Sequence, residues 1–197
     1  EILISAEDAA VLEVNSRIAF TTDSFTVNPI FFNGGNIGKL AVAGTVNDLA
    51  MMGAKPLYLS ASFIIEEGFL FDELQTIVAS MAKELQYSGA KIVCGDTKVV
   101  PKGAVDQLFI NTSGIGEIAK KGISSNSIQE GDVIIVSGDV GRHGAAVLME
   151  REGLGISGEL QSDCATLWPA VQSLIDADVS ISAMRDATRG GLSAVLN

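Results

Sequence analysis

The sequence has 197 residues, 47% of them hydrophobic, and a formal net charge of −11 from 13 basic and 24 acidic residues. This length is enough to bury one large or two small hydrophobic cores. The acidic excess and the lack of any Lys/Arg cluster argue against nucleic-acid binding, and glycines and charges interrupt every apolar run well short of a membrane span.

The first half of the chain predicts alternating strands and helices. Strands are expected at residues 9–14 and 17–22 (joined at Asn15–Ser16), 57–65, 90–94 and about 105–118. Residues 28–38 predict a loop, and the apolar spacing predicts a helix over 39–52 that Gly53 ends. A second helix is expected to begin at Asp72, as N-cap of a capping box with Gln75, and to end at Gly89.

A domain boundary is predicted near residues 119–131, a polar stretch rich in Ser, Asn, Gly and Lys. Beyond it we expect a strand at 133–137, a Gly-rich loop, helices from about 144 and from about 163 to 176, and a strand at 179–184. The predicted fold class is therefore an α+β N-terminal domain, residues 1–120, followed by an α/β C-terminal domain that begins within residues 121–197.

Both ends of the sequence predict a fragment of a longer protein. Residue 1 is not Met, and the chain enters on an apolar run that carries no signal-peptide pattern. The chain stops at Asn197, inside the first turns of a helix expected to begin at Gly190–Gly191. We therefore expect the C-terminal domain to be truncated.

Four aspartates are candidates for a functional site. Asp23, Asp96 and Asp186 each follow a short apolar stretch, where an aspartate can also be an ordinary turn residue. Asp48, next to Asn47, lies on an apolar helix, where a carboxylate is unfavourable and needs a partner. Several carboxylates converging on one cleft of so acidic a chain would repel one another unless a cation joined them. An oxygen-only ligand set suits Mg²⁺ with substrate phosphates, so the residues alone predict a Mg²⁺–nucleotide site.

Other residues allow two interpretations each. The turn at residues 138–144 can bind an anion or simply join a strand to a helix, and it matches no phosphate-loop or dinucleotide motif. His143 is an acid–base candidate or a hydrogen-bond partner at a helix terminus. Lys98 is a candidate for contacting a phosphate or, alternatively, an ordinary solvated lysine. Cys94 is expected in the core and Cys164 to be structural, and the lack of disulfide spacing predicts a reducing cytoplasm.

Three stretches together carry a resemblance to a known family. They are residues 20–56 (FTTDSFTVNPIFFNGGNIGKLAVAGTVNDLAMMGAKP), 95–100 (GDTKVV) and 185–192 (RDATRGGL). They closely resemble the HypE family of [NiFe]-hydrogenase maturation proteins, the carbamoyl dehydratases. That family belongs to the ATP-binding superfamily of aminoimidazole ribonucleotide synthetase, selenophosphate synthetase and thiamine-monophosphate kinase. The resemblance covers essentially the whole chain.

The resemblance implies a fold and a set of site residues. The mixed sheet of the N-terminal domain pairs with that of a second subunit into a dimeric barrel, with ATP in a cleft at this sheet. The resemblance implies that Asp23, Asp48 and Asp186 hold Mg²⁺, together with Asp8 if it acts as the second carboxylate of an element in which Glu7 replaces the first. The resemblance also implies a nucleotide-cleft group, Asn47, Gly95, Thr97 and Asp186, and places Asp96 in the same cleft. With Lys98 and His143, which are candidates from their own chemistry, Asp96 makes up the set of catalytic candidates.

The implied reaction is the ATP-dependent dehydration of a carbamoyl group on the protein's own C-terminal cysteine thiol to thiocyanate, which supplies cyanide to the hydrogenase iron. The implied partners are a second copy of the chain, the HypF carbamoyltransferase and the HypC–HypD complex. Neither Cys94 nor Cys164 matches the reactive cysteine by position, and the family's N-terminal Gly-rich segment is not found, so we expect the given residues alone to be inactive.

Two alternatives remain at this stage. The first is another ATP-dependent enzyme of the superfamily that acts on a small molecule, of the kinase, selenophosphate synthetase or ribonucleotide synthetase type. The second is a non-catalytic nucleotide-binding scaffold. A reactive terminal cysteine would favour the dehydratase over the first alternative, and ATP binding without hydrolysis would favour the scaffold.

Overall fold

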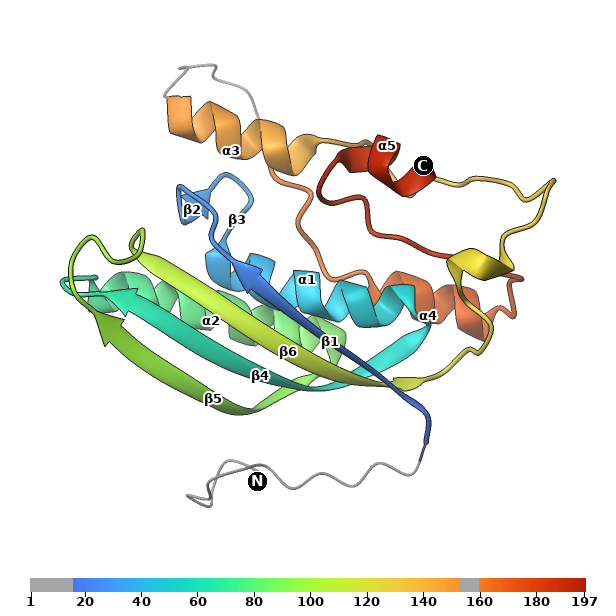
Figure 1. Cartoon of the computed structure of the whole chain (residues 1–197), viewed down its shortest axis with the longest axis horizontal. Coiled ribbons are helices and arrows are strands. Elements are labelled where there is room, and N and C mark those ends of the chain that lie inside the picture. The colour runs from blue at the N-terminus through green and yellow to red at the C-terminus, as the bar shows by residue number, and fades with distance from the viewer. Residues whose placement is uncertain (1–15, 153–159) are drawn as a thin grey trace.

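The structure is a computed structural model that describes residues 16–152 and 160–197 (Figure 1). Its strands are β1 (Ile18–Phe25), β2 (Phe31–Phe32), β3 (Gly35–Asn36), β4 (Ala54–Glu66), β5 (Lys91–Val100) and β6 (Leu108–Ile118). Its helices are α1 (Ile37–Met51), α2 (Phe71–Ser88), the short 3₁₀ helix η1 (Ser125–Ser127), α3 (Arg142–Glu152), α4 (Trp168–Asp176) and α5 (Gly191–Leu196).

The main sheet has the strand order β1-β6-β4-β5. Strands β4 and β5 are parallel, whereas β6 is antiparallel to both β1 and β4, so the sheet is mixed as predicted. Helices α1 and α2 cover one face of it, and α4 lies beside α1 (Figure 1). Within residues 16–152 and 160–197 the other face is open, which leaves Phe20 on β1 67% exposed.

Helix α1 is the most deeply buried element. It begins at Ile37 because Asn36 caps it: the Asn36 side chain accepts hydrogen bonds from the backbone N–H groups of Gly38 (2.9 Å) and Lys39 (3.1 Å). Its small and branched residues pack against the sheet, α2 and α4 together. A helix buried on several sides needs no single apolar stripe, and that is why the sequence of α1 is apolar nearly throughout.

Two glycines set how closely α1 approaches its neighbours. A Cβ atom added to Gly38 would lie 2.5 Å from the carbonyl oxygen of Ile77 on α2, and one added to Gly114 on β6 would lie 2.8 Å from Thr45 on α1. Both distances are shorter than real Cβ contacts. The glycines therefore permit a helix–helix and a helix–sheet contact that any larger residue would push apart.

Several predicted elements form, with shifted ends. The strand predicted at 90–94 extends to Val100 because it pairs with β4 up to Glu66, and the strand predicted at 57–65 begins earlier, at Ala54, because β6 pairs with it there. Gly89 ends α2 in the left-handed conformation, as expected, and α5 begins at Gly191. The predicted strand 17–22 is β1, whereas residues 9–14 lie outside the described residues.

Other predictions were wrong. Helix α2 begins at Phe71 after Leu70, so Asp72 lies inside its first turn and makes no capping box with Gln75. The helix predicted from 163 begins at Trp168, with Pro169 in its first turn, where the missing backbone N–H leaves no intrahelical bond unmade. Residues 133–137 and 179–184 are not strands. In the part of the chain that is described, no strand lies beside either segment to satisfy its backbone.

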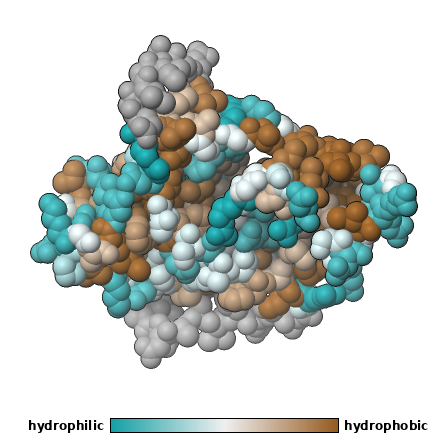
Figure 2. All heavy atoms as spheres, turned by 45° about the horizontal axis from the view of Figure 1, so that its top comes forward, coloured by the Kyte–Doolittle hydropathy of each residue, from teal (hydrophilic) through white to brown (hydrophobic). Residues whose placement is uncertain are grey.

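The segment at 133–136 consequently exposes its side chains. Val133, Ile134 and Ile135 are each at least 69% exposed. Figure 2 shows hydrophobic residues gathered at the upper right, where Figure 1 places the segment that follows η1. None of the described helices is long and apolar enough to cross a membrane.

Gly38→Ala tests the close approach of α1 and α2. We expect this substitution to lower the free energy of unfolding by about 1–3 kcal/mol, because the added methyl group must displace the backbone of α2. Gly144→Ala is the matched control, because Gly144 lies in the first turns of α3 with open space around it. There the helix propensity of alanine should stabilise the protein by about 0.5–1 kcal/mol. Urea unfolding of both variants measures the difference, and equal stabilities would contradict the packing argument.

Candidate functional site

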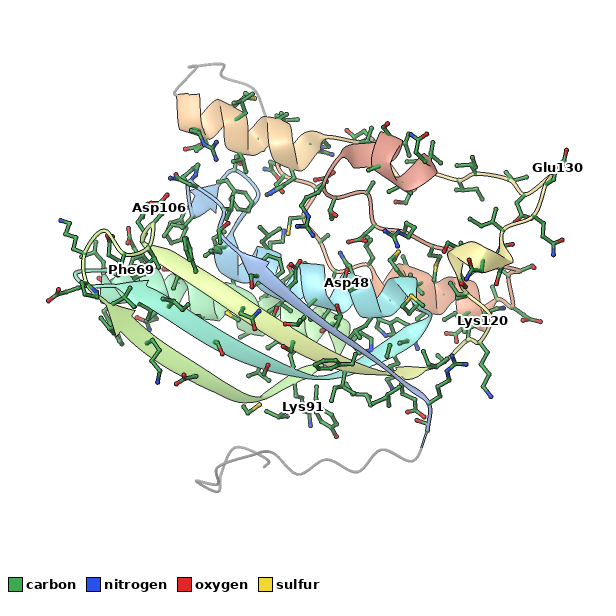
Figure 3. The ribbon with its side chains drawn as sticks, viewed as in Figure 1. Asp48, Phe69, Lys91, Asp106, Lys120 and Glu130 are labelled. Carbon is green, nitrogen blue, oxygen red and sulfur yellow. The ribbon has the colours of Figure 1, made fainter. Side chains whose placement is uncertain are left out.

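Asp48, Asp23 and Asp186 come together beside α1. Thr21 and Asp23 lie on the same face of β1, because they are two residues apart in a strand, and this face meets α1. The Thr21 hydroxyl donates a 2.8 Å hydrogen bond to Asp48, which lies on α1 where β1 passes in front of it in Figure 3. Asp186 approaches from the segment that follows α4, close enough to influence the charge on Asp48.

The surroundings of Asp48 disfavour the charged form of its carboxyl, first through burial and then through two neighbouring carboxylates. Burial raises the pKa of the Asp48 carboxyl above 3.8, and the negative charges of Asp186 and Asp23 raise it further. The hydrogen bond from Thr21 and the positive charge of Arg185 oppose this rise without cancelling it. The charged form of Asp48 is therefore destabilised, which is the condition under which a bound cation would have most effect.

Asn47, predicted to line the nucleotide cleft, makes two hydrogen bonds to the protein itself. Its Nδ2 donates to the carbonyl oxygen of Ala165 (3.0 Å), and its Oδ1 accepts from the backbone N–H of Leu167 (2.8 Å). Both ends of the amide are thus bound to the segment just before α4. Asn47 and Asp48 are neighbours in sequence, but their side chains have different partners.

The structure places the predicted residues Gly95, Asp96, Thr97 and Lys98 on β5, away from Asp48. Asp23 on β1 and Gly95 on β5 occupy the same row across the sheet, at its two opposite edges. Three strand spacings separate these edges, roughly 14 Å. Asp96 pairs with Ser62 on the open face, so it also lies on the other side of the sheet from Asp48. One chain therefore does not bring the two groups together.

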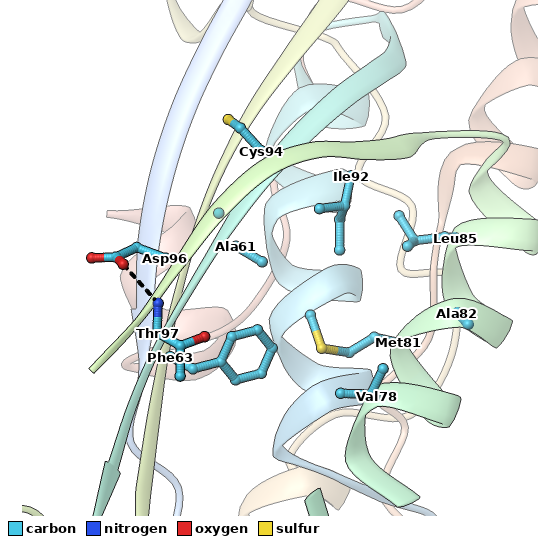
Figure 4. A pocket seen from close by; sticks show the side chains of 11 residues that line it. Ala61, Phe63, Val78, Met81, Ala82, Leu85, Ile92, Cys94, Asp96 and Thr97 are labelled. Atoms are coloured by element: carbon cyan, nitrogen blue, oxygen red, sulfur yellow. Dashed lines mark hydrogen bonds between the residues drawn. The ribbon is translucent and has the colours of Figure 1, made fainter. Parts of the chain in front are cut away.

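Gly95, Asp96 and Thr97, but not Lys98, line a groove between β5 and α2 (Figure 4). The groove has a volume of about 540 Å³ and is mostly apolar, with Gly95, Asp96 and Thr97 at one end. Asp96 is exposed, and the hydrogen bonds from Lys98 and from the backbone N–H of Thr97 lower the pKa of its carboxyl. Lys98 is exposed as well and forms a 3.2 Å ion pair with Asp96. The structure within one chain thus matches the solvated interpretation of Lys98.

His143 lies in the first turn of α3, apart from both groups. Its backbone N–H donates to Asp163 (3.0 Å), and its Nδ1 is 3.0 Å from the hydroxyl oxygen of Ser162. Its ring also meets the edge of Phe32, with centroids 5.1 Å apart. Burial lowers the pKa of His143 below 6.5, although the charge of Asp163 opposes this. These contacts fit the interpretation of His143 as a hydrogen-bond partner at a helix terminus, and Asp163 occupies part of the predicted anion site.

The cysteines follow the predictions only in part. Burial raises the pKa of the Cys164 thiol to about 12, which keeps it protonated and fits a structural role. The prediction of a core position for Cys94 was wrong, because Cys94 is exposed. It lies on the face of β5 that pairs with Ser60, and no described element covers this face.

The oxygen donors near Asp48 suit Mg²⁺ without forming a closed cage. In residues 16–152 and 160–197, no group of three or more His, Cys, Asp or Glu side chains converges closely enough to hold a metal ion. Mg²⁺ keeps few protein ligands and takes the remainder from phosphates and water, so an open set of carboxylates fits it. The fourth predicted ligand, Asp8, lies outside the described residues.

Sequence analysis missed two participants in this site. Thr21 was counted only as part of a strand, although its position two residues before Asp23 places both side chains on one face. Arg185 precedes Asp186 directly and is the one cation that acts on Asp48 among the residues whose charges influence it in the described structure. The sequence signal for Thr21 is strand alternation, but its bond to Asp48, 27 residues away, is a tertiary contact.

Comparison with protein families identifies both halves of the chain. The family model described as AIR synthase related protein, N-terminal domain, matches residues 6–118, and the corresponding C-terminal domain model matches residues 129–197. The mixed sheet with its helices, followed by a second domain, is therefore the two-domain fold of these proteins.

Individual relatives are much closer. The chain is 50% identical over 202 residues to the carbamoyl dehydratase HypE of Escherichia coli (strain K12), a match that covers 99% of this chain and 60% of the relative. The crystal structure of a hydrogenase maturation protein HypE in complex with ATP matches with a TM-score of 0.95 and 49% identity, over 99% of this chain and 58% of that one. The structure of a HypE–HypF complex matches with a TM-score of 0.88 and 52% identity, over 96% and 62%.

These matches confirm the resemblance to HypE that the sequence predicted. They also show that the chain spans about three-fifths of the length of the relatives it matches. The names and complexes describe those relatives. The match covers 99% of this chain, so it includes the segments that carry Asp23, Asp48 and Asp186.

Replacing Asp48 by Asn should stabilise the fold in the absence of metal. Because the folded-state pKa of Asp48 is raised, the fold favours the protonated carboxyl, and this contribution is lost as pH rises from about 3.8 through the folded-state pKa. Asp48→Asn should therefore raise the melting temperature at pH 7 in EDTA. Screening at this half-exposed site limits the gain to on the order of 1–3 °C. The same variant at pH 3 is the control, where wild type and variant should melt alike. A lower melting temperature at pH 7 would contradict the assigned repulsion.

Proposed function

The chain belongs to the AIR synthase-related family, and from that premise we propose that it forms the ATP-binding part of a carbamoyl dehydratase of the HypE type. The proposed reaction converts a carbamoyl group on the protein's own C-terminal cysteine thiol to a thiocyanate, at the expense of ATP. The observation that carries the proposal is the Asp23–Asp48–Asp186 cluster, in a chain 49% identical to a HypE that binds ATP.

The proposed chemistry uses phosphate as a leaving group. The carbamoyl oxygen takes the γ-phosphoryl group of ATP, which releases ADP. Loss of inorganic phosphate and a proton then leaves a carbon–nitrogen triple bond on sulfur. An amide oxygen is a poor leaving group and a phosphate is a good one, so the protein's task is mainly to position the reactants and to stabilise developing negative charge.

We assign roles to the residues of the cluster on this basis. Asp23, Asp48 and Asp186 would hold Mg²⁺, with Asp8 as a further candidate ligand, and the metal would offset the charge of the phosphates. Thr21 orients Asp48 through its hydrogen bond. Arg185, next to Asp186, would add a positive charge beside the cluster, where it already acts on Asp48.

The residues on β5 complete the site if they come from a second copy of the chain. Asp96, Lys98, Gly95 and Thr97 lie at the opposite sheet edge and are exposed. A dimer that packs the open faces of two sheets into a barrel would bury Phe20 and Ile18, and it would carry the β5 edge of one copy toward the β1 edge of the other. We propose that arrangement, with His143 outside the reacting groups.

The proposal extends to the surroundings of the enzyme. We infer a cytoplasmic protein with an N-terminal ATP-binding, dimerising domain within residues 1–120 and a C-terminal domain that begins within 121–197. The partner that supplies the carbamoyl group is a HypF carbamoyltransferase, since a relative 52% identical forms a complex with HypF. The partner that accepts cyanide is a HypC–HypD complex. The small-molecule enzyme is disfavoured by the degree of identity to HypE.

Mass spectrometry of the full-length protein tests the function. After incubation with HypF, carbamoyl phosphate and ATP, the protein should gain the mass of one carbamoyl group, and Mg²⁺–ATP should then remove the mass of one water. Asp48→Asn should gain the carbamoyl group but lose water at least about 100-fold more slowly, since it removes a charge from the metal site. Dehydration by the variant at the normal rate and Mg²⁺ dependence would refute the assignment. A wild type that HypF never modifies would favour a small-molecule enzyme.

Phe20→Glu tests the proposed dimer. Phe20 is 67% exposed on the open sheet face, and a charge there should prevent two faces from packing. We expect a dimer for the wild type and a monomer for this variant by light scattering at micromolar concentration. Phe71→Glu is the matched control, because Phe71 is 77% exposed at the start of α2, on the other side of the sheet. A monomeric wild type, or a control that dissociates equally, would contradict the interface.

A further inference from the structure

The side-chain amide of Asn47 links helix α1 to the backbone of the segment just before α4. Asn47 follows Val46 on α1, and its partners Ala165 and Leu167 lie about 120 residues further along. An amide side chain that donates to one backbone carbonyl and accepts from a backbone N–H two residues on reproduces one rung of a β-ladder. Such a contact depends on the backbone conformation of residues 165–167 and not on their side chains.

Neighbouring contacts fix the same stretch from α2. The Thr166 hydroxyl, between the two partners of Asn47, donates to the carboxylate of Glu84 (2.9 Å), and Glu84 is only 5% exposed. Trp168, at the start of α4, is 4% exposed and packs in the core cluster. Residues 165–168 are therefore held by α1 and α2 together.

The far end of α4 is held as well. Lys120, labelled in Figure 3, donates to the carbonyl oxygen of Val179 (2.8 Å), and the backbone N–H of Ser124 donates to the carbonyl oxygen of Ser182 (3.0 Å). The chain then reaches Arg185 and Asp186, which act on Asp48. The segment 165–186 thus contacts α1 twice: its first residues bind Asn47, and its last residue, Asp186, acts on the adjacent Asp48.

We propose that Asn47 is a positioning residue of the Asp48 site: it holds residues 165–167 against α1, and through α4 it sets where Asp186 stands opposite Asp48. In this proposal its effect on the site passes through residues 165–167, to which both ends of its amide are bound, and not through a contact with the nucleotide. This inference rests on the proposed function for the role of Asp48 and Asp186, whereas the contact itself is independent of that function.

Two variants separate the bonds that Asn47 makes. Asn47→Ala removes both, whereas Asn47→Asp keeps the acceptor for Leu167 but places a carboxylate against the carbonyl oxygen of Ala165. Asn33→Ala is the matched control. Asn33 also donates from its side chain to a backbone carbonyl of the later segment, that of Leu160 (2.9 Å), but it lies in the β2–β3 hairpin and not beside Asp48.

The test combines amide hydrogen exchange with Mg²⁺ dependence in the full-length protein. In Asn47→Ala the Leu167 amide should exchange at least about tenfold faster, the ratio that a loss of about 1.4 kcal/mol gives. The Mg²⁺ concentration for half-maximal ATP turnover should rise by about the same factor in both Asn47 variants, while kcat at saturating Mg²⁺ changes less. ATP affinity in EDTA should stay unchanged, and Asn33→Ala should leave Mg²⁺ dependence as in the wild type.

Two outcomes would overturn the inference. Unchanged exchange of Leu167 in Asn47→Ala would show that the contact does not hold the segment. Weaker ATP binding in EDTA, with unaltered Mg²⁺ dependence, would make Asn47 a nucleotide ligand instead. Failure of the proposed function is a separate result, since it would appear as normal Mg²⁺-dependent turnover in Asp48→Asn while the exchange measurement on Leu167 still stands.

Discussion

The close packing of α1 against the sheet is the constraint on which the candidate site depends. The Thr112 hydroxyl on β6 donates to the carbonyl oxygen of Ala41 on α1 (3.0 Å), so its single proton is used there. The 2.5 Å contact between the hydroxyls of Thr45 and Thr112 must then be donated by Thr45. Both side chains are fully buried, so moving the helix away would leave buried polar groups without hydrogen bonds, at a cost in free energy. A buried polar chain of this kind fixes the helix in one position, which apolar packing alone does less strictly.

That fixed position gives Asn47 and Asp48 their separate partners. Asp48 stays close enough to β1 to accept the bond from Thr21, and Asn47 reaches the backbone before α4. The cost is a carboxylate that is partly buried and held near two others in the folded state, and both conditions oppose its ionisation. A carboxylate whose charged form the fold disfavours, on the most deeply buried helix, is better explained by a ligand than by stability, because an asparagine would keep the hydrogen bond from Thr21 without the charge.

The sequence predicted what depends on local patterns. The helices α1 and α2 and the strands β4 and β6 follow from periodicity and from glycines at their ends, and Asp48 was identified because a carboxylate on an apolar helix needs a partner. What depends on distant pairing was not predictable. β5 continues past Asp96 because β4 pairs with it, and residues 133–137 do not become a strand without a neighbour. Asn47 has the residue type of a ligand, but its hydrogen bonds depend on a backbone about 120 residues away.

The separation of the two residue groups is itself an argument about assembly. Asp23 and Asp48 belong to the helix-covered face at the β1 edge, and Asp96 belongs to the open face at the β5 edge. No rearrangement of side chains spans three strands and crosses a sheet. A two-fold axis over the open face, however, relates the two edges of one copy to the opposite edges of the other. That face carries Phe20, Ile18 and Ile64 around a central band of hydroxyl and amide groups, among them Ser113 and Asn111. Apolar side chains that surround a polar centre are what a symmetric interface would bury, so the open surface and the separated residues support the same proposal of a second copy.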